Sequence, residues 1–390
     1  MAGVGGPLSE AGSRPAGRRV VAVAVAAFVV LAMPKAAFGV AWPTVAGDLG
    51  REIADLGAIL AVYSGGYFIG TLSVGWVVRL AGTGLALSGA AAGLVVAVIG
   101  YAAAGTWLVL IGAAALLGIA GGIVDAGINA HVALHHSPGV MGWLHAGFGA
   151  GSAAGPALVT GLLAVGAGWR PGFWVVAGLQ ALLLLALAVT RSEWEGPVPG
   201  RPRVRIGRQP IVLLTLIVFM LYVGLEVAAV QWGFTLLTEG RGIGTWVAGL
   251  SITGYWIALT GMRVGLGIAG ARTPPAPVAA AAALATALTT GLLWWSPWVW
   301  VGPFAMVALG AALGPIFPLQ TVLTPRRVGA EATTTMVGFQ MAAAALGAIV
   351  IPGGLGPLVS WWGVGVVPPV LFVTALGLVA ADAAARRVSG

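Results

Sequence analysis

The sequence contains no cysteine, and only 8% of its 390 residues are charged. Without thiols the chain can form no disulfide bond, no thiol nucleophile and no thiolate metal site. With 59% hydrophobic residues and a mean hydropathy of +1.00, it has more apolar surface than a soluble domain of this size can bury. These values indicate an integral membrane protein.

Glycine, by contrast, is abundant, with 63 residues. It weakens helices in water, but small residues let helices in a membrane approach one another closely. Two stretches, Gly118-x-x-x-Gly122 and Gly151-x-x-x-Gly155, have the spacing of such close contacts. The glycines therefore predict a tightly packed helical bundle.

Segments of about 20 mostly apolar residues are long enough to cross a bilayer of about 30 Å. We expect an all-α membrane protein with twelve transmembrane helices in two six-helix halves, at residues 19–46, 53–78, 82–104, 107–134, 139–166, 170–190, 210–237, 245–269, 276–295, 298–323, 329–353 and 361–381. The first segment contains Pro34 and Lys35 and is longer than the apolar part of a signal peptide, so we expect it to be retained.

The basic residues predict the orientation, because cytoplasmic loops retain Lys and Arg. With the N-terminus inside, only Arg51, Arg170 and Arg241 fall on the outer side. We expect both termini in the cytoplasm and a multi-pass protein of the cell (inner) membrane.

The longest connection between spans is rich in Pro and Arg and divides the chain. We expect an N-terminal six-helix bundle at 1–190, a basic cytoplasmic linker at 191–209 and a C-terminal six-helix bundle at 210–390. The net charge of +8 comes from basic residues spread over several inner loops, without a nucleic-acid-binding motif. We therefore expect contacts with membrane lipid and none with nucleic acid.

Two carboxylates interrupt apolar spans, Asp125 in 107–134 and Glu226 in 210–237. Such residues are costly in a membrane and usually face a polar cavity or a partner along a solute or ion path. Asp125 and Asn129 are four residues apart and share a helix face. We predict that Asp125, Glu226 and His145 couple transport to protons. Structural alternatives remain, an ion pair for Asp125 and an interhelical hydrogen bond for His145.

A polar and aromatic group follows Glu226 within two helical turns, at Gln231 and Trp232. Amide and carboxylate groups suit sugar hydroxyls, and an indole suits the apolar face of a pyranose, although aromatic residues at helical spacing also serve packing. The predicted substrate-binding residues are Lys35, Tyr67, Asn129, Gln231, Trp232, Trp256 and Gln340.

Lys35 is the only lysine and lies deep in the first span. It could pair with Asp125 or Glu226 in the empty site, bind an anionic solute directly, or reach the outer headgroups where Pro34 unwinds the helix.

Arg79 and Arg263 lie at comparable positions at the inner ends of the second and eighth spans, and we predict that they form a gate or contact lipid headgroups. His131 and His135 have a metal-like spacing but no third ligand at a suitable distance, so we predict no metal site. No Walker motif is present, and the Gly-rich runs lie inside spans. We expect neither an enzyme nor an ATP-driven pump.

Several motifs resemble one family of transporters. They are Gly122-Ile-Val-Asp125-Ala-Gly-Ile-Asn129, Leu144-His145-Ala-Gly-Phe148-Gly149-Ala-Gly151, Tyr222-Val-Gly224-Leu-Glu226, Gly314-Pro315-Ile-Phe317-Pro318 and Gly338-Phe339-Gln340. Their order resembles the fucose:proton symporter branch of the major facilitator superfamily and its bacterial permease relatives.

The resemblance implies proton-coupled uptake of a hexose-like solute by alternating access, with Asp125 as the coupling acid and Asn129 in the cavity. The chain departs from the founding sugar carriers in the first span, where Gly39 stands in place of an acid before Pro43.

We therefore expect a monomeric secondary transporter for a sugar or sugar-like small solute, with the proton as coupling ion and no cofactor. A proton-coupled exporter of drugs or metabolites and a carrier of an anionic solute such as a sugar acid are the alternatives.

Overall fold

The computed structural model describes residues 15–136, 138–194, 209–269, 274–296 and 298–389. These residues form thirteen α-helices and short 3₁₀ turns. The helices are α1 (Pro15–Asp48), α2 (Leu56–Ala81), α3 (Thr83–Ala103), α4 (Trp107–His135), α5 (Pro138–Ala164), α6 (Arg170–Val189), α7 (Pro210–Thr238), α8 (Thr245–Ala269), α9 (Pro275–Trp295), α10 (Val301–Leu313), α11 (Ile316–Val328), α12 (Ala330–Trp362) and α13 (Val367–Ser389).

Within the described residues, eleven helical stretches are long and apolar enough to cross a membrane, with α10 and α11 counted as one. α8 is not among them, although its 25 residues give it the length of a span. A helix pairs its own backbone N–H and C=O groups, for which the hydrocarbon of a bilayer offers no hydrogen-bond partner. The prediction of an all-α, multi-pass membrane protein is confirmed.

A predicted boundary near the C-terminus is wrong. We expected a span to end at residue 353, but α12 continues through Pro352 and Pro357 to Trp362. The span predicted at 298–323 matches one membrane-length stretch, Val301–Val328, whose helix breaks between α10 and α11 at Gly314 and Pro315. Membrane helices tolerate proline where a neighbouring group satisfies the carbonyl that the proline leaves unpaired.

Pro34 in α1 illustrates this compensation. Because Pro34 has no N–H, the carbonyl of Val30 has no partner within α1. Gln180 on α6 donates its side-chain amide to that carbonyl oxygen at 3.1 Å. The proline is therefore accommodated, and α6 is fixed against α1.

Both predicted glycine motifs lie at close helix crossings. A Cβ atom at Gly118 would overlap the carbonyl oxygen of Tyr63, and one at Gly122 would overlap that of Tyr67. Gly151 on α5 meets the backbone of α1 as closely. Only glycine lets α4 approach α2 to this distance, and the approach brings Tyr67 next to α4.

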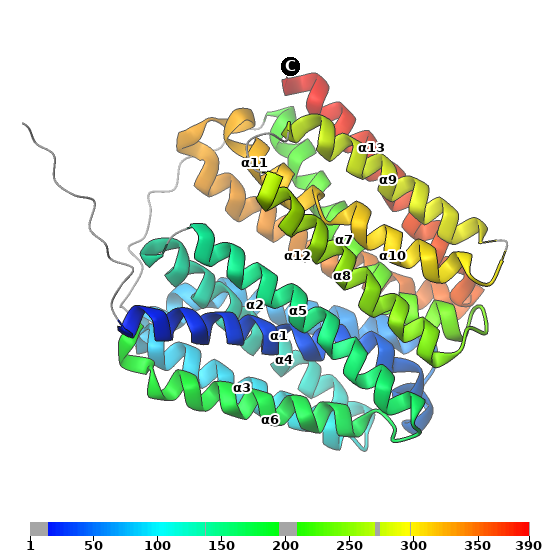
Figure 1. Cartoon of the computed structure of the whole chain (residues 1–390), viewed down its shortest axis with the longest axis horizontal. Coiled ribbons are helices and arrows are strands. Elements are labelled where there is room, and N and C mark those ends of the chain that lie inside the picture. Colours follow the sequence, from blue (N-terminus) through cyan, green and yellow to red (C-terminus); the bar gives the residue numbers. More distant parts are fainter. Residues whose placement is uncertain (1–14, 137, 195–208, 270–273, 297, 390) are drawn as a thin grey trace, which may run out of the picture.

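Helices α1–α6, the N-terminal group, pack mainly against one another, and so do α7–α13, the C-terminal group (Figure 1). The groups meet mainly where α2 contacts α12, α5 contacts α8 and α1 contacts α7. The division into bundles at 1–190 and 210–390 stays a prediction, and residues 195–208 of the predicted linker lie outside the described residues.

The bundle has two ends, an Asp48 end and an Arg191 end. At the Asp48 end, Trp169 and Arg170 at the start of α6 donate to the carboxylate of Asp48 at 2.9 and 2.5 Å. At the opposite, Arg191 end, α6 ends and the start of α3 packs on the backbone of Arg191.

Candidate functional site

Asp125 lies on α4 and is partly exposed although it sits within a membrane-length helix. Its carboxylate accepts hydrogen bonds from the hydroxyl of Tyr67 on α2 and from the amide of Asn129, the latter at 2.9 Å. Asn129 is one helical turn away on the same face, as the spacing predicts. Two donors from two helices therefore hold this carboxylate in a fixed position.

Lys35 on α1 is also partly exposed. Its ammonium lies 5.8 Å from the centre of the Tyr63 ring and interacts electrostatically with Asp125 and Glu226. Among the described residues, no carboxylate oxygen lies within 4.0 Å of the Lys35 ammonium. The ion pairs that these residues form all involve arginine instead. The structure thus brings Lys35 near both acids without a direct ion pair.

Glu226 on α7 has different partners. Its carboxylate accepts from the hydroxyl of Tyr222 and from Nη2 of Arg263 on α8, at 3.2 Å for the latter. The same guanidinium nitrogen donates to the Tyr222 hydroxyl at 2.9 Å. The Glu226 and Arg263 side chains are 14% and 26% exposed, so the ion pair is largely shielded from solvent.

Arg263 also reaches the break between α10 and α11. Its Nε donates to the carbonyl oxygen of Gly314 at 3.4 Å. That carbonyl has no helical partner because residue 318 is a proline. Arg263, predicted as a gate residue, therefore connects Glu226 to the broken helix.

His145 and Arg79 lie apart from these contacts. His145 on α5 is exposed, packs edge-to-face on Phe28 with ring centres 6.2 Å apart, and interacts electrostatically with Arg263. Arg79 lies exposed in the last turn of α2.

Gln231 and Trp232 lie in helix–helix contacts. The Gln231 amide donates to the backbone carbonyl of Lys35 at 2.9 Å, and the indole N–H of Trp232 donates to the carbonyl of Pro352 at 3.0 Å. Trp232 is 0% exposed and Gln231 is 2% exposed. In this conformation, both residues join α7 to neighbouring helices.

Trp256 and Gln340 are buried as well. Trp256 lies 6.4 Å from the Phe148 ring across the contact between α8 and α5, and its buried indole N–H has no hydrogen-bond partner among the described residues. Gln340 on α12 donates to the hydroxyl of Thr324 on α11 at 2.8 Å.

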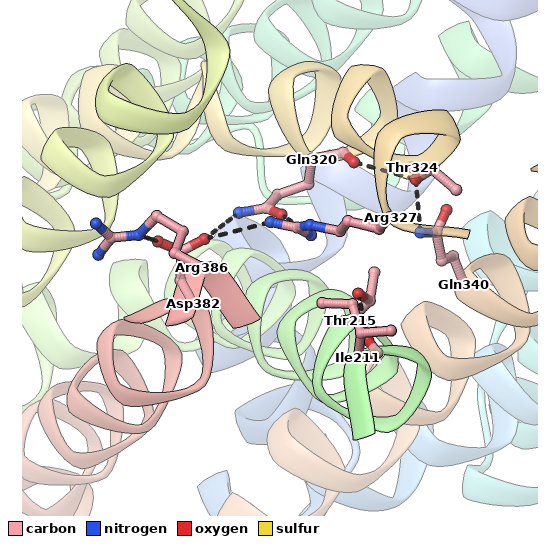
Figure 2. A network of polar contacts seen from close by, with 8 residues as sticks. All are labelled: Ile211, Thr215, Gln320, Thr324, Arg327, Gln340, Asp382 and Arg386. Carbon is pink, nitrogen blue, oxygen red and sulfur yellow. Dashed lines mark hydrogen bonds and ion pairs between the residues drawn. The ribbon is translucent and has the colours of Figure 1, made fainter. Parts of the chain in front are cut away.

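A buried ionic network at the Arg191 end was not predicted (Figure 2). Asp382 on α13 is 1% exposed and accepts from Gln320 at 2.6 Å and from Arg386 at 3.0 Å. Arg327 on α11 lies 4.0 Å from the same carboxylate and donates to Gln320 at 2.8 Å. The last predicted span ended at residue 381, one residue before Asp382, and no role was predicted for Asp382.

A pocket of about 330 Å³ lies between the two helix groups at the Asp48 end. Its lining includes Glu239 and residues from α1, α5, α7 and α8, among them Thr44, Leu163, Phe234 and Thr245.

His131 and His135 lie on α4 with their ring centres 4.6 Å apart. In the part of the chain that the structure describes, no group of three His, Cys, Asp or Glu side chains could hold a metal ion.

Carboxylates and cations held inside the spans of a polytopic helical protein are typical of solute and ion pathways in membrane transporters. Residues 24–352 match the family model of the Major Facilitator Superfamily, and the chain belongs to this family. A comparison with curated protein sequences finds no match.

Solved transporters share the fold. The nucleoside transporter NupG has a TM-score of 0.74 at 12% identity, covering 95% of this chain and 99% of its own. A D-xylose–proton symporter has a TM-score of 0.73 at 14% identity, covering 93% and 97%. The peptide transporter POT has a TM-score of 0.74 at 13% identity, covering 95% of both chains. At such low identity the likeness shows the fold alone.

Proposed function

We propose that the chain is a proton-coupled secondary transporter of a small, sugar-like solute, in the fucose:proton symporter branch of its family. The observation that carries this proposal is Asp125, a partly exposed carboxylate inside a span, held by Tyr67 and Asn129. A carboxylate that meets water first from one side of the membrane and then from the other can load a proton and release it.

Alternating access would come from rocking of the N-terminal group against the C-terminal group. In support, the two groups touch near the Asp48 end, where the first turns of α2 approach α12 at Gly57 and Gly356, and α5 meets α8 at Thr160 and Gly249. We propose that these contacts close the path from the Asp48 end, with the pocket at Thr44, Leu163 and Thr245 on their outer side, and that the site is accessible from the Arg191 end.

The distribution of arginine favours the Arg191 end as the cytoplasmic side. We therefore propose an inward-facing state, cytoplasmic termini and residence in the cell (inner) membrane. We further propose that the protein works as a monomer, with protons as the coupling ion and without a cofactor, and that it catalyses no chemical reaction.

A sugar-like solute is supported by polar groups that are partly exposed next to Asp125, the Asn129 amide and the hydroxyls of Tyr63 and Tyr67. The named substrates of two transporters with this fold, D-xylose and nucleosides, are also hydroxylated rings. The proposed solute site comprises Lys35, Tyr67 and Asn129, and Trp256, which packs against Phe148, stays a predicted member of it.

The test is uptake and charge movement in proteoliposomes, with neutral hexoses, sugar acids and hydrophobic cations offered at two pH values. We expect an inward proton gradient to drive uphill accumulation of one of the hydroxylated solutes. In Asp125→Asn, accumulation should be lost while solute exchange is partly kept, because exchange needs no net proton transfer.

Glu52→Gln, which removes an exposed acid before α2, is the matched control and should accumulate solute normally. Undiminished uphill uptake by Asp125→Asn would refute the role of Asp125. A response to hydrophobic cations alone would make the chain an exporter.

A further inference from the structure

Four ionisable side chains lie within electrostatic range in the middle of the spans. Lys35 interacts with Asp125 and Glu226, and Glu226 is paired with Arg263. With all four ionised, the charges of the two acids and two bases sum to zero. Since uncompensated charge is costly inside a membrane protein, this balance constrains what the site can bind.

The four groups differ in how they are satisfied. Asp125 has its donors in Tyr67 and Asn129, and Glu226 has its donors in Tyr222 and Arg263. The Lys35 ammonium carries three N–H donors. The ammonium lies over the face of the Tyr63 ring. No carboxylate oxygen of the described residues lies within 4.0 Å of the ammonium.

We infer that the transported solute carries one carboxylate, that this carboxylate binds the ammonium of Lys35, and that one proton enters with it on Asp125. This inference rests on the proposed function and specifies its substrate class. The ammonium supplies charge-assisted hydrogen bonds. Tyr67 and Asn129 donate to Asp125, so their oxygen atoms as acceptors, together with the Tyr63 hydroxyl, would bind a hydroxylated body.

Charge balance requires the proton. A carboxylate bound at Lys35 brings the sum of charges to minus one, and protonation of Asp125 restores zero. The groups that contact or interact with Asp125 are Lys35 on α1, Tyr63 and Tyr67 on α2 and Asn129 on α4. Lys35 also interacts with Glu226 on α7, which Tyr222 and Arg263 hold, and His145 on α5 interacts with Arg263. The tyrosines and a neutral His145 leave the sum unchanged, so the loaded carrier crosses without net charge.

A single carboxylate fits better than a phosphate. Arg263 already holds Glu226 and the Gly314 carbonyl, so Lys35 is the cation left for the solute. One ammonium balances a monoanion, whereas a phosphate dianion would remain half compensated near two acids.

The first test measures thermal stabilisation of the purified full-length chain by matched pairs of compounds. The pairs are galactose with galacturonate, glucose with glucuronate and glycerol with glycerate, and glucose 6-phosphate probes the phosphate class. We expect a carboxylate to stabilise the protein more than its neutral twin and more than the phosphate.

Lys35→Met should weaken binding of the stabilising carboxylate roughly 10- to 100-fold, the range of a charge-assisted hydrogen bond. Lys35→Arg should restore part of it. Arg18→Met removes an exposed cation from the same helix and should leave it unchanged. The inference is wrong if no carboxylate stabilises the wild type more than its neutral twin, or if Lys35→Met binds it equally well.

The second test measures tracer uptake of that carboxylate in proteoliposomes. We expect acceleration by an inward proton gradient and no acceleration by an inside-negative membrane potential. Acceleration by the potential would overturn the one-to-one coupling. If a proton gradient drives uptake of a neutral hexose, and this uptake is the same in the wild type and in Lys35→Met, the inference is refuted while the proposed function is kept. Carboxylate binding at Lys35 without a response to the proton gradient would refute the proposed proton coupling and the proton step of this inference, and would leave only the assignment of Lys35 as the carboxylate ligand.

Discussion

Ser64 on α2 donates a hydrogen bond to the backbone carbonyl of Ala348 on α12, at 3.1 Å. Ala348 lies four residues before Pro352, which has no N–H, so its carbonyl has no partner within α12. Ser64 supplies the missing donor from the other helix group. The bond therefore stabilises the conformation in which α2 and α12 lie together.

We expect Ser64→Ala to shift the equilibrium away from this conformation. A neutral hydrogen bond contributes about 1 kcal/mol, which corresponds to a shift of roughly fivefold. Because the chain has no cysteine, spin labels at Ala58→Cys and Ser360→Cys, both exposed on α2 and α12, can report the distance. Double electron–electron resonance should show a larger population of long distances between the two labels in Ser64→Ala than in the otherwise identical labelled protein.

Ser88→Ala is the control for this change, because the Ser88 hydroxyl bonds to Gly84 within α3. It should leave the distance distribution unchanged. An unchanged distribution in Ser64→Ala as well would mean that the bond does not contribute to closure.

Gly122→Ala should disturb the candidate site through the backbone. Its Cβ atom would overlap the carbonyl oxygen of Tyr67, the residue whose hydroxyl holds Asp125. Overpacking of this kind costs about 1–3 kcal/mol. We expect a lower thermal midpoint and uptake reduced at least about tenfold, on the order of the same free energy.

Gly112→Ala is the matched control on the same helix, since nothing lies within 4 Å of its Cβ position. Uptake and the thermal midpoint should match those of the wild type. Equal behaviour of the two variants would show that α4 can move away from α2 without loss.

Asp382→Asn should loosen α13. The carboxylate accepts from Gln320 and Arg386 and faces Arg327, so its neutralisation leaves the buried guanidinium of Arg327 uncompensated (Figure 2). Loss of one partner from a buried ion pair costs about 3 kcal/mol. Thermal unfolding in detergent should therefore begin at a clearly lower temperature.

Arg387→Gln serves as the control, because Arg387 is exposed in the last turn of the same helix. Its midpoint should stay within error of the wild type. A normal midpoint in Asp382→Asn would mean that the network contributes no net stability.

Part of the candidate site was predictable, and the reason is local. Asp125 and Asn129 are one turn apart on one helix, and the structure finds them hydrogen-bonded at 2.9 Å. Gly118 and Gly122 predicted a close crossing but not the partner helix. The gate role of Arg263 stays a prediction, and its ion pair with Glu226 depends on the packing of α7 against α8, which the sequence did not predict.

The sequence by itself determined the class of the protein, the helical character of its spans and the acids within them. Hydrophobic run length and helical periodicity are properties of consecutive residues, and a bilayer accepts few structures for them. Only the tertiary structure decided that Tyr67 donates a hydrogen bond to Asp125, that Ser64 donates one to the carbonyl of Ala348 and that Trp232 is buried. These relations depend on which helices pack together, and the free energy of packing is shared among residues far apart in the chain.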